Sequence, residues 1–129
     1  MTGSRGPLSK DGRFLPPSGR DGPVPELPER EWRPETLVWW EGVWRSPMAT
    51  QFVESDRHEL ARLALLVDEF MQSPSRELAA EIRMQGAAFG LSPASRKRLG
   101  WVIRDVPPDP PKRGDRLKVI DPVAAAAVD

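Results

Sequence analysis

Proline placement limits where this chain can form a packed domain. Most of its 15 prolines fall in residues 1–34 and 107–122, in runs such as PPSGRDGPVPELPER and PPDPPKRGD. Proline lacks a backbone N–H, and segments of this composition offer little apolar surface to offset the entropy of ordering the chain. We therefore expect a disordered N-terminal tail over residues 1–33, a folded domain over 34–106 and a flexible basic tail over 107–129.

Cysteine and long apolar runs are both missing from the sequence. Without cysteine the chain has no disulfides, no thiolate metal sites and no cysteine nucleophile. No stretch approaches the roughly 18 apolar residues of a membrane span, and the N-terminal residues lack the apolar core of a signal peptide. We expect a cytoplasmic protein that does not enter the membrane.

The 19 basic and 19 acidic side chains cancel overall, but they are unevenly distributed. Residues 34–90 carry five arginines and nine acids, a net charge of −4, whereas residues 91–118 carry eight basic side chains and three acids, a net charge of +5. Overall neutrality argues against a simple polycation that binds DNA. The distribution instead indicates an acidic body with a basic C-terminal third.

Serine followed by proline suits the N-cap and first-turn positions of a helix, and such steps divide the predicted domain. The first helix is expected to begin at Pro34 and to bury Leu37, Trp40 and Trp44 on one face. A short helix over 48–53 is expected to follow it.

The strongest periodic pattern spans residues 55–72, where Ser55 is the expected N-cap. Its apolar residues recur at the spacing of one helix face, namely Leu60, Leu63, Ala64, Val67, Phe70 and Met71. This spacing predicts a long amphipathic helix at the centre of the fold.

Two more helices are expected in the rest of the domain. One runs over 75–89 and ends at Gly90 in a left-handed conformation, and Gly86 inside it indicates the close approach of another helix. The other runs from Ser92-Pro93 through Arg104. It is expected to face the core with three residues, Leu99, Val102 and Ile103. Because no strand pattern of useful length is present, the predicted fold is all-α, a bundle of about four helices.

Few side chains are suited to catalysis. His58 is the only histidine, and it lies among charged residues where a solvated side chain is far more common than a catalytic one. Asp68-Glu69 and Glu77-Glu81 have the spacing of solvated helix faces rather than of metal ligands. No GxxxxGK[ST] segment is present to hold ATP. We expect a non-enzymatic protein with no metal or cofactor.

Basic residues are the best candidates for nucleic-acid contacts. The cluster at 96–98 lies in the first half of the last predicted helix, where cations act against the helix dipole, and a position that breaks such a rule is a candidate for function. The cluster also fits a solubilising face or pairing with acids of the preceding helix, and the basic tail also fits a spacer. The candidate DNA contacts are Arg96, Lys97, Arg98, Arg104, Lys112, Arg113, Arg116 and Lys118.

Five tryptophans are more than one small core hides easily. Trp39 and Trp40 are adjacent and point about 100° apart on a helix, so they cannot both face the same interior. Tryptophan is enriched at the buried centres of protein interfaces. We take Trp39, Trp40 and Trp44 as candidates for a contact between subunits, with base stacking on an exposed tryptophan as the alternative.

The segment FGLSPASRKRL, from Phe89 to Leu99, resembles the aromatic-Gly-Leu-Thr/Ser-Pro-x-x-Arg-x-x-Leu ending of small terminase subunits from actinobacterial phages and prophages. The Trp-rich first helix and the Ser-Pro-Met-Ala step after it are similar to that family too. The arginine of the family segment corresponds to Arg96 and its last leucine to Leu99. This resemblance covers the whole predicted domain.

The resemblance implies a non-catalytic protein that recognises double-stranded viral DNA, assembles into a homo-oligomeric ring in the cytoplasm of the bacterial host, and hands the DNA to the large terminase subunit, an ATPase and nuclease. Many such subunits carry an N-terminal helix-turn-helix, which residues 1–33 do not provide, so the basic C-terminal third is the expected DNA surface. Two other classes stay open. One is a helical head-completion or connector-type interaction protein, and the other is a small DNA-binding transcriptional regulator that reads a palindrome as a dimer.

Overall fold

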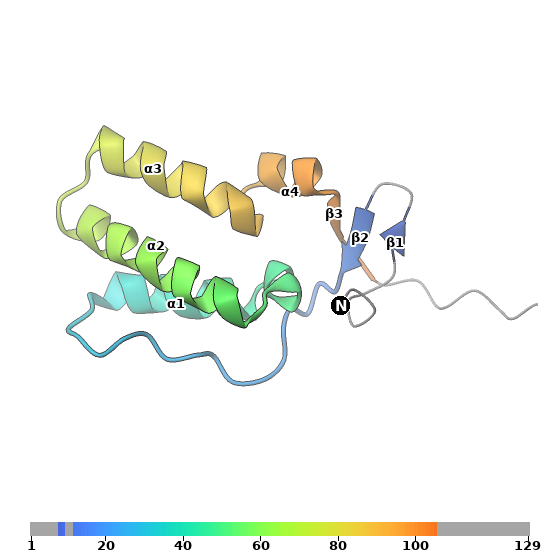
Figure 1. Ribbon diagram of the computed structural model, residues 1–129, viewed down its shortest axis with the longest axis horizontal. Coiled ribbons are helices and arrows are strands. Elements are labelled where there is room, and N and C mark those ends of the chain that lie inside the picture. Colours follow the sequence, from blue (N-terminus) through green and yellow to red (C-terminus); the bar gives the residue numbers. More distant parts are fainter. Residues whose placement is uncertain (1–7, 10–11, 106–129) are drawn as a thin grey trace, which may run out of the picture.

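The computed structural model describes residues 8–9 and 12–105 of the chain. Its helices are α1 (Pro34–Arg45), α2 (Glu54–Gln72), α3 (Arg76–Gly86) and α4 (Pro93–Leu99), joined in part by the 3-10 turns η2 (Pro47–Gln51) and η3 (Ala87–Phe89). The short strands are β1 (Leu8–Ser9), β2 (Gly12–Leu15) and β3 (Trp101–Ile103). Figure 1 shows α2 between α1 and α3, with α4 and the strands gathered at one end. The prediction of a mostly helical fold is confirmed.

α2 supplies the centre of the core, as its apolar spacing predicts. Leu60, Leu63 and Ala64 are fully buried in it. They pack against buried residues of α1 and η2, namely Trp40, Val43, Trp44 and Ala49. The N-cap is Val53, two residues earlier than expected, because the carboxylate of Asp56 accepts a hydrogen bond from the backbone N–H of Val53 at 2.9 Å and fixes the first turn there. Ser55 is therefore inside α2 and is not its N-cap.

The end of α3 differs from the prediction in one detail. The helix stops at Gly86, and residues 87–89 form η3. Gly90 adopts the predicted left-handed conformation, with φ of 69°. A Cβ at Gly86 would lie 3.3 Å from the side chain of Leu91, so the close approach predicted at this glycine comes from the following turn and not from another helix.

The last predicted helix is too long. α4 ends at Leu99 because Gly100 turns left-handed with φ of 75°, and the next three residues form β3. Leu99, Val102 and Ile103 were expected in the core but are 41%, 38% and 40% exposed. β-branched residues such as Val102 and Ile103 favour a strand, and a strand of three residues is too short to show a clear alternation in the sequence.

A small sheet corrects the all-α prediction and joins distant parts of the chain. β2 pairs with β1 in antiparallel and with β3 in parallel, in the order β1-β2-β3. The N–H of Arg13 donates to the carbonyl oxygen of Gly100 at 2.7 Å, and the N–H of Arg104 donates to that of Leu15 at 3.0 Å. Leu15 is fully buried, so β2 is anchored in the core as well as in the sheet.

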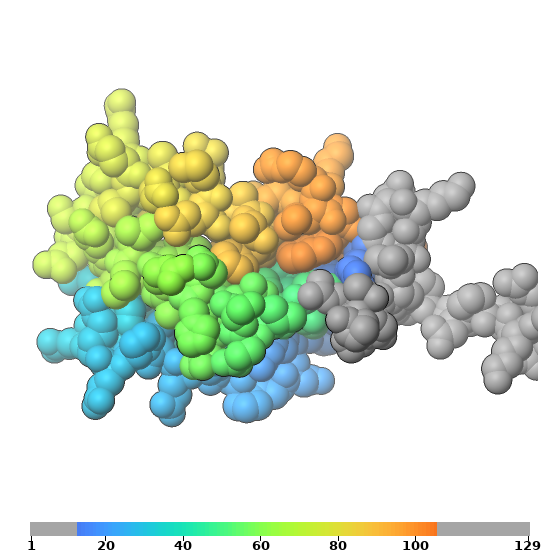
Figure 2. Space-filling model, in the orientation of Figure 1, coloured from blue at the N-terminus to red at the C-terminus, as the bar shows by residue number. Residues whose placement is uncertain are grey.

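The proline-rich residues 16–33, here named the strap, lie along the helices instead of forming a disordered tail. The strap runs extended beside α1, and Figure 2 shows it covering one side of the molecule. Val24, Leu27 and Trp32 pack against the core. The indole N–H of Trp40 donates to the carbonyl oxygen of Pro25 at 2.6 Å.

Proline explains why the strap is ordered although it is not helical. A fixed φ reduces the conformational entropy that an extended segment loses when it docks, so the residues that prevent a helix also favour the docked strap. The folded part of the chain therefore includes residues 12–33, N-terminal to the predicted boundary at 34. The rest of the predicted N-terminal tail, 1–7 and 10–11, and the predicted tail over 107–129 lie outside the described residues.

Candidate nucleic-acid interface

Two serines fix the start of α4, as the Ser-Pro step predicts. The Oγ of Ser92 accepts a hydrogen bond from the N–H of Ser95 at 3.2 Å, and the Oγ of Ser95 accepts one from the N–H of Ser92 at 3.1 Å. Pro93 occupies the first turn, where its missing N–H is not needed. This reciprocal cap sets the orientation of α4 and of the basic residues along it.

Arg96 is partly buried, and its guanidinium is bound within the fold. Its guanidinium Nη1 donates to the carbonyl oxygen of Gly90 at 2.8 Å and lies 4.0 Å from the sulfur of Met48. A Cβ at Gly90 would lie 2.6 Å from the ring of Trp101, so only glycine fits beneath that ring. Arg96, Gly90 and Trp101 thus form one structural unit, and Arg96 is a poor candidate for a DNA contact.

Lys97 and Arg98 are both exposed, and neither side chain makes a hydrogen bond or ion pair with any residue in the described ranges. The alternative pairing with acids of α3 is not found there, and Glu81 instead accepts a hydrogen bond from Gln85. Arg104 is exposed too, with its guanidinium 4.2 Å from the centre of the Phe14 ring.

The remaining candidate contacts, Lys112, Arg113, Arg116 and Lys118, lie outside the described residues. The structure therefore brings three candidate DNA contacts to the end of the molecule that holds α4 and β3, namely Lys97, Arg98 and Arg104.

The three candidate interface tryptophans have different environments. Trp40 and Trp44 are each 4% exposed and belong to the core of one chain, so they are not available to anchor a second subunit. Adjacent positions on α1 point in different directions, which leaves Trp39 half-buried at the surface. Trp39 lines an apolar groove with residues of α2, α3 and the following turn, namely Val67, Phe70, Met71, Ala79, Ile82, Arg83, Gly86, Leu91 and Ser92.

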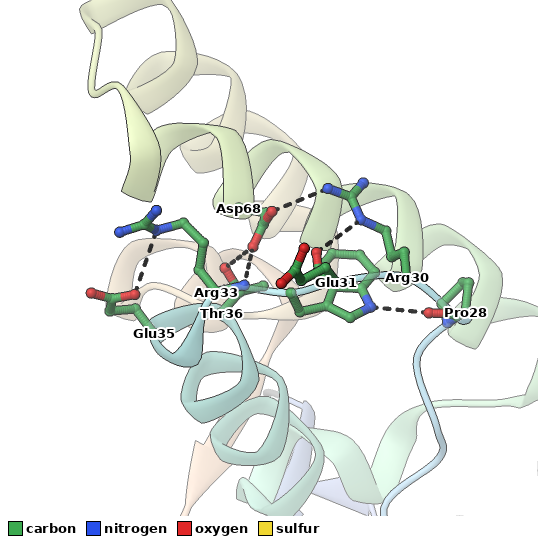
Figure 3. Close-up of polar contacts among 8 residues, drawn as sticks. Pro28, Arg30, Glu31, Arg33, Glu35, Thr36 and Asp68 are labelled. Carbon is green, nitrogen blue, oxygen red and sulfur yellow. Dashed lines mark hydrogen bonds and ion pairs between the residues drawn. The ribbon is translucent and has the colours of Figure 1, made fainter.

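Asp68 was assigned to a solvated helix face, but the structure buries it to 5% exposure. Figure 3 shows its carboxylate at the junction of α2, α1 and the strap. Oδ1 accepts hydrogen bonds from the hydroxyl of Thr36 at 2.7 Å and from the N–H of Arg33 at 2.9 Å. Oδ2 pairs with Arg30 at 3.2 Å. The sequence does contain a signal, because position 68 follows Ala64 by four residues and so lies on the apolar face of α2.

The environment of Asp68 favours its charged form. Burial raises the pKa of this carboxyl, but the hydrogen bonds from Thr36 and Arg33, together with the positive charges of Arg30 and Arg33, outweigh it and hold the pKa below the ordinary value of 3.8. Asp68 therefore fastens the strap and the start of α1 to α2, a structural role with no sign of chemistry.

Comparison with known proteins supplies the family. A family model described as phage terminase small subunit matches residues 9–127. The chain belongs to the phage terminase small subunit family. The match includes the described domain and extends into the basic residues beyond it. No curated protein and no solved structure matches the chain.

The described part of this terminase small subunit includes an exposed cationic surface at Lys97 and Arg98. His58 is exposed, and residues 8–9 and 12–105 contain no group of three or more His, Asp or Glu side chains placed to hold a metal ion. None of the helices in those residues has the length and apolar character needed to cross a bilayer. Family membership supports a role related to genome packaging.

Proposed function

We propose that this terminase small subunit recognises double-stranded viral DNA for packaging in the cytoplasm of the bacterial host and regulates the large subunit, without catalysis or a cofactor of its own. The family match over residues 9–127 carries the proposal. It is supported by Lys97 and Arg98, which are exposed at consecutive positions of α4 and have no ion-pair partner among the described residues. Phosphate attracts such cations, and binding releases counterions from the DNA.

The proposed DNA surface centres on Lys97 and Arg98. Arg104 lies near the same end of the molecule but also stacks on Phe14, which gives it a structural partner. The basic residues Lys112, Arg113, Arg116 and Lys118 extend the cationic region along the sequence. Contacts of this kind fix the position of the protein on the duplex and do not read its sequence.

Fluorescence anisotropy with a labelled duplex tests the proposal, measured as a function of salt. The double variant Lys97→Ala/Arg98→Ala is expected to bind about tenfold more weakly at roughly 100 mM salt, and its salt slope should fall by about two, because two phosphate contacts are lost. The matched control is Arg57→Ala/Arg62→Ala, since Arg57 is partly exposed and Arg62 exposed, and both already pair with acids of α2, Glu54 and Glu59.

The titration also separates the alternatives. An unchanged affinity and slope in the double variant would place the DNA surface elsewhere in the chain. A wild-type protein that does not bind duplex at all under these conditions would favour the head-completion or connector-type interaction protein instead.

We also propose that the chain acts as a homo-oligomer, with the groove beside Trp39 at the contact between subunits. Its support is the apolar character of the groove and the enrichment of tryptophan at interface centres. Light scattering should show a smaller assembly for Trp39→Ala than for the wild type. Met84→Ala is the control, because Met84 is exposed but does not line the groove. A monomeric wild-type chain at high concentration would reject the proposal.

A further inference from the structure

Among the described residues, β3 pairs along one side only. It is the last strand in the order β1-β2-β3. The carbonyl oxygen of Gly100 accepts from Arg13, and the N–H of Arg104 donates to Leu15. The C=O and N–H of one trans peptide point in opposite directions. The N–H of Trp101 and the C=O of Ile103 therefore point away from β2.

Strand geometry adds two more groups to this free edge. The N–H and C=O of one residue in a strand point to the same side, and those of the next residue point to the other side. The C=O of Trp101 and the N–H of Ile103 thus join the outward groups. Within the described residues, no strand lies on this side of β3, and no turn or loop bond reaches these groups.

A groove runs between this edge and α4. Pro93, Arg96, Lys97 and Gly100 line one side, and β3 lines the other, around a volume of about 380 Å³. The two charged residues of the lining are both basic. Arg96 keeps its positive charge although its Nη1 is bound to Gly90, and Lys97 is the more exposed of the two.

The surface of β3 is apolar as well as unpaired. Val102 and Ile103 are both well exposed, and both line the groove. Natural proteins usually protect such an edge with charges, a proline or a covering segment, because a free strand edge is a template for pairing with another chain. Addition of an extended segment supplies main-chain hydrogen bonds for affinity and side-chain contacts for specificity.

We propose that the groove between α4 and β3 binds an extended segment of a partner protein in which acidic and apolar residues alternate. The partner main chain pairs with Trp101 and Ile103. Because alternate side chains of a strand point to opposite faces, its apolar side chains lie on the face of Val102 and its acidic side chains lie on the face toward α4. Its carboxylates face Lys97, and this charge complementarity selects an acidic segment over a basic one. Asp105 is exposed just beyond β3 and repels acidic groups. The carboxylates of the partner therefore lie on the side of the groove formed by α4.

Nuclear magnetic resonance of the 15N-labelled full chain tests the proposal with a short synthetic peptide that alternates valine and glutamate and is blocked at both ends. The amides of Trp101 and Ile103 are expected to shift in a saturable way. A matched peptide with lysine in place of glutamate should bind about tenfold more weakly, because its charge is repelled by Lys97.

A proline variant tests the main-chain pairing. Ile103→Pro removes an N–H that points away from β2, so the bonds between β2 and β3 remain while the glutamate peptide binds about tenfold more weakly. Ile103→Val is the matched comparison at the same position, since it keeps the N–H and a β-branched side chain, and it should bind the glutamate peptide more tightly than Ile103→Pro does. Should the proline variant fail to fold, a glutamate peptide methylated on alternate amide nitrogens tests the same pairing on the wild type and should also fail to bind.

The same measurements distinguish this proposal from DNA binding. Lys97→Glu should weaken the binding of both peptide and duplex, whereas Ile103→Pro should weaken the binding of the peptide alone. A duplex that shifts the amides of Trp101 and Ile103 while the glutamate peptide does not would assign the groove to DNA and overturn the proposal.

Three further outcomes would overturn it. The first is equal binding of the glutamate and lysine peptides, or no binding of either. The second is a shift of the same amides when the protein alone is concentrated, which would assign the edge to a second copy. The third is protection of these amides from exchange in the free chain together with exclusion of the peptide, which would assign the groove to residues 106–129 of the chain itself.

Discussion

Two regions of the molecule differ in whether their basic side chains form ion pairs. In the body, here residues 30–68, basic side chains are paired with acids, as in Arg30–Asp68, Arg33–Glu35, Arg45–Glu41, Arg57–Glu54 and Arg62–Glu59. In the end region, here residues 90–104, Lys97 and Arg98 have no such partner within the described ranges. Basic side chains of the body are neutralised by acids of the same chain, whereas the unpaired cations of the end region can bind another molecule.

Apolar residues divide in the same way. Leu60 and Leu63 of the body are fully buried, whereas Val102 and Ile103 of the end region are exposed. A helix of seven residues and a strand of three provide little core, so the end region depends on specific backbone contacts. We infer that substitutions in the body act through burial and charge, and that those in the end region act through backbone geometry and binding.

The largest effect is expected at Asp68. Asp68→Ala leaves the N–H of Arg33 and the hydroxyl of Thr36 without their acceptor, which should lower the free energy of unfolding by about 3 kcal/mol. Since Arg30 remains 45% exposed, the ion pair contributes the smaller share. Urea denaturation measures the change. Glu69→Ala, at the exposed neighbouring position, should change stability by less than about 0.5 kcal/mol.

The contribution of Asp68 to stability should depend on pH. Its pKa is lowered in the folded chain, so its contribution to stability is complete above the ordinary value of 3.8 and is lost as the pH falls through the folded value. Denaturation of the wild type and of Asp68→Asn should therefore differ less at pH 3 and below than at pH 7. A difference that does not shrink on acidification would argue against a charged Asp68.

A substitution at Gly90 tests whether the end region depends on its backbone geometry. Gly90→Ala forces a left-handed φ on alanine and places its Cβ against the ring of Trp101, which should lower stability by about 2 kcal/mol. Gly42→Ala is the matched control, because a Cβ there meets no other atom within 4 Å and α1 should gain about 0.5 to 1 kcal/mol. Equal effects of the two substitutions would mean that Trp101 does not pack over Gly90.

Substitutions of Arg96 and Arg98, two residues apart on α4, should distinguish an effect on folding from an effect on DNA binding. Arg96→Ala loses the bond to Gly90 and should cost about 1 to 1.5 kcal/mol of stability. Arg98→Ala should leave stability within about 0.5 kcal/mol but weaken duplex binding several-fold. Thermal unfolding and anisotropy measured on both variants check the pair. The reverse result would return Arg96 to the DNA surface.

The smallest effect is expected from an exposed ion pair of the body. Arg45 pairs with Glu41 at 2.9 Å one helical turn away, and both side chains are more than half exposed. Arg45→Ala should therefore change the free energy of unfolding by about 0.5 kcal/mol or less, and added salt should abolish the difference. A loss comparable to that at Asp68 would break the distinction between buried and exposed charges within the body.

The body was largely predictable from sequence because its signals are repeated. The spacing of Leu60, Leu63 and Ala64 marks the buried face of α2 by itself, and Pro34 marks the first residue of α1. Asp68 was missed because its partners are 32 to 38 residues away, in the strap and α1. Only a polar residue at an apolar-face position signals such a partner.

The end region was less predictable because its structure depends on single contacts between distant residues. β3 forms because its backbone meets β2, and three residues carry no period of their own. Arg96 and Lys97 are adjacent in one basic cluster, yet only Arg96 reaches the carbonyl of Gly90. The strap was misjudged since proline content predicts the absence of a helix and says nothing about docking onto Trp40.

The parallel pairing of β2 with β3 sets an order of assembly. Arg13 lies opposite Trp101, a separation of 88 positions, whereas α2 and α3 are neighbours in the chain. Long-range pairing of this kind closes later than local helix contacts. During synthesis the ribosome releases residues 101–103 after the helices of the described residues, so a nascent chain acquires the groove that a partner would enter only once β3 has emerged and paired.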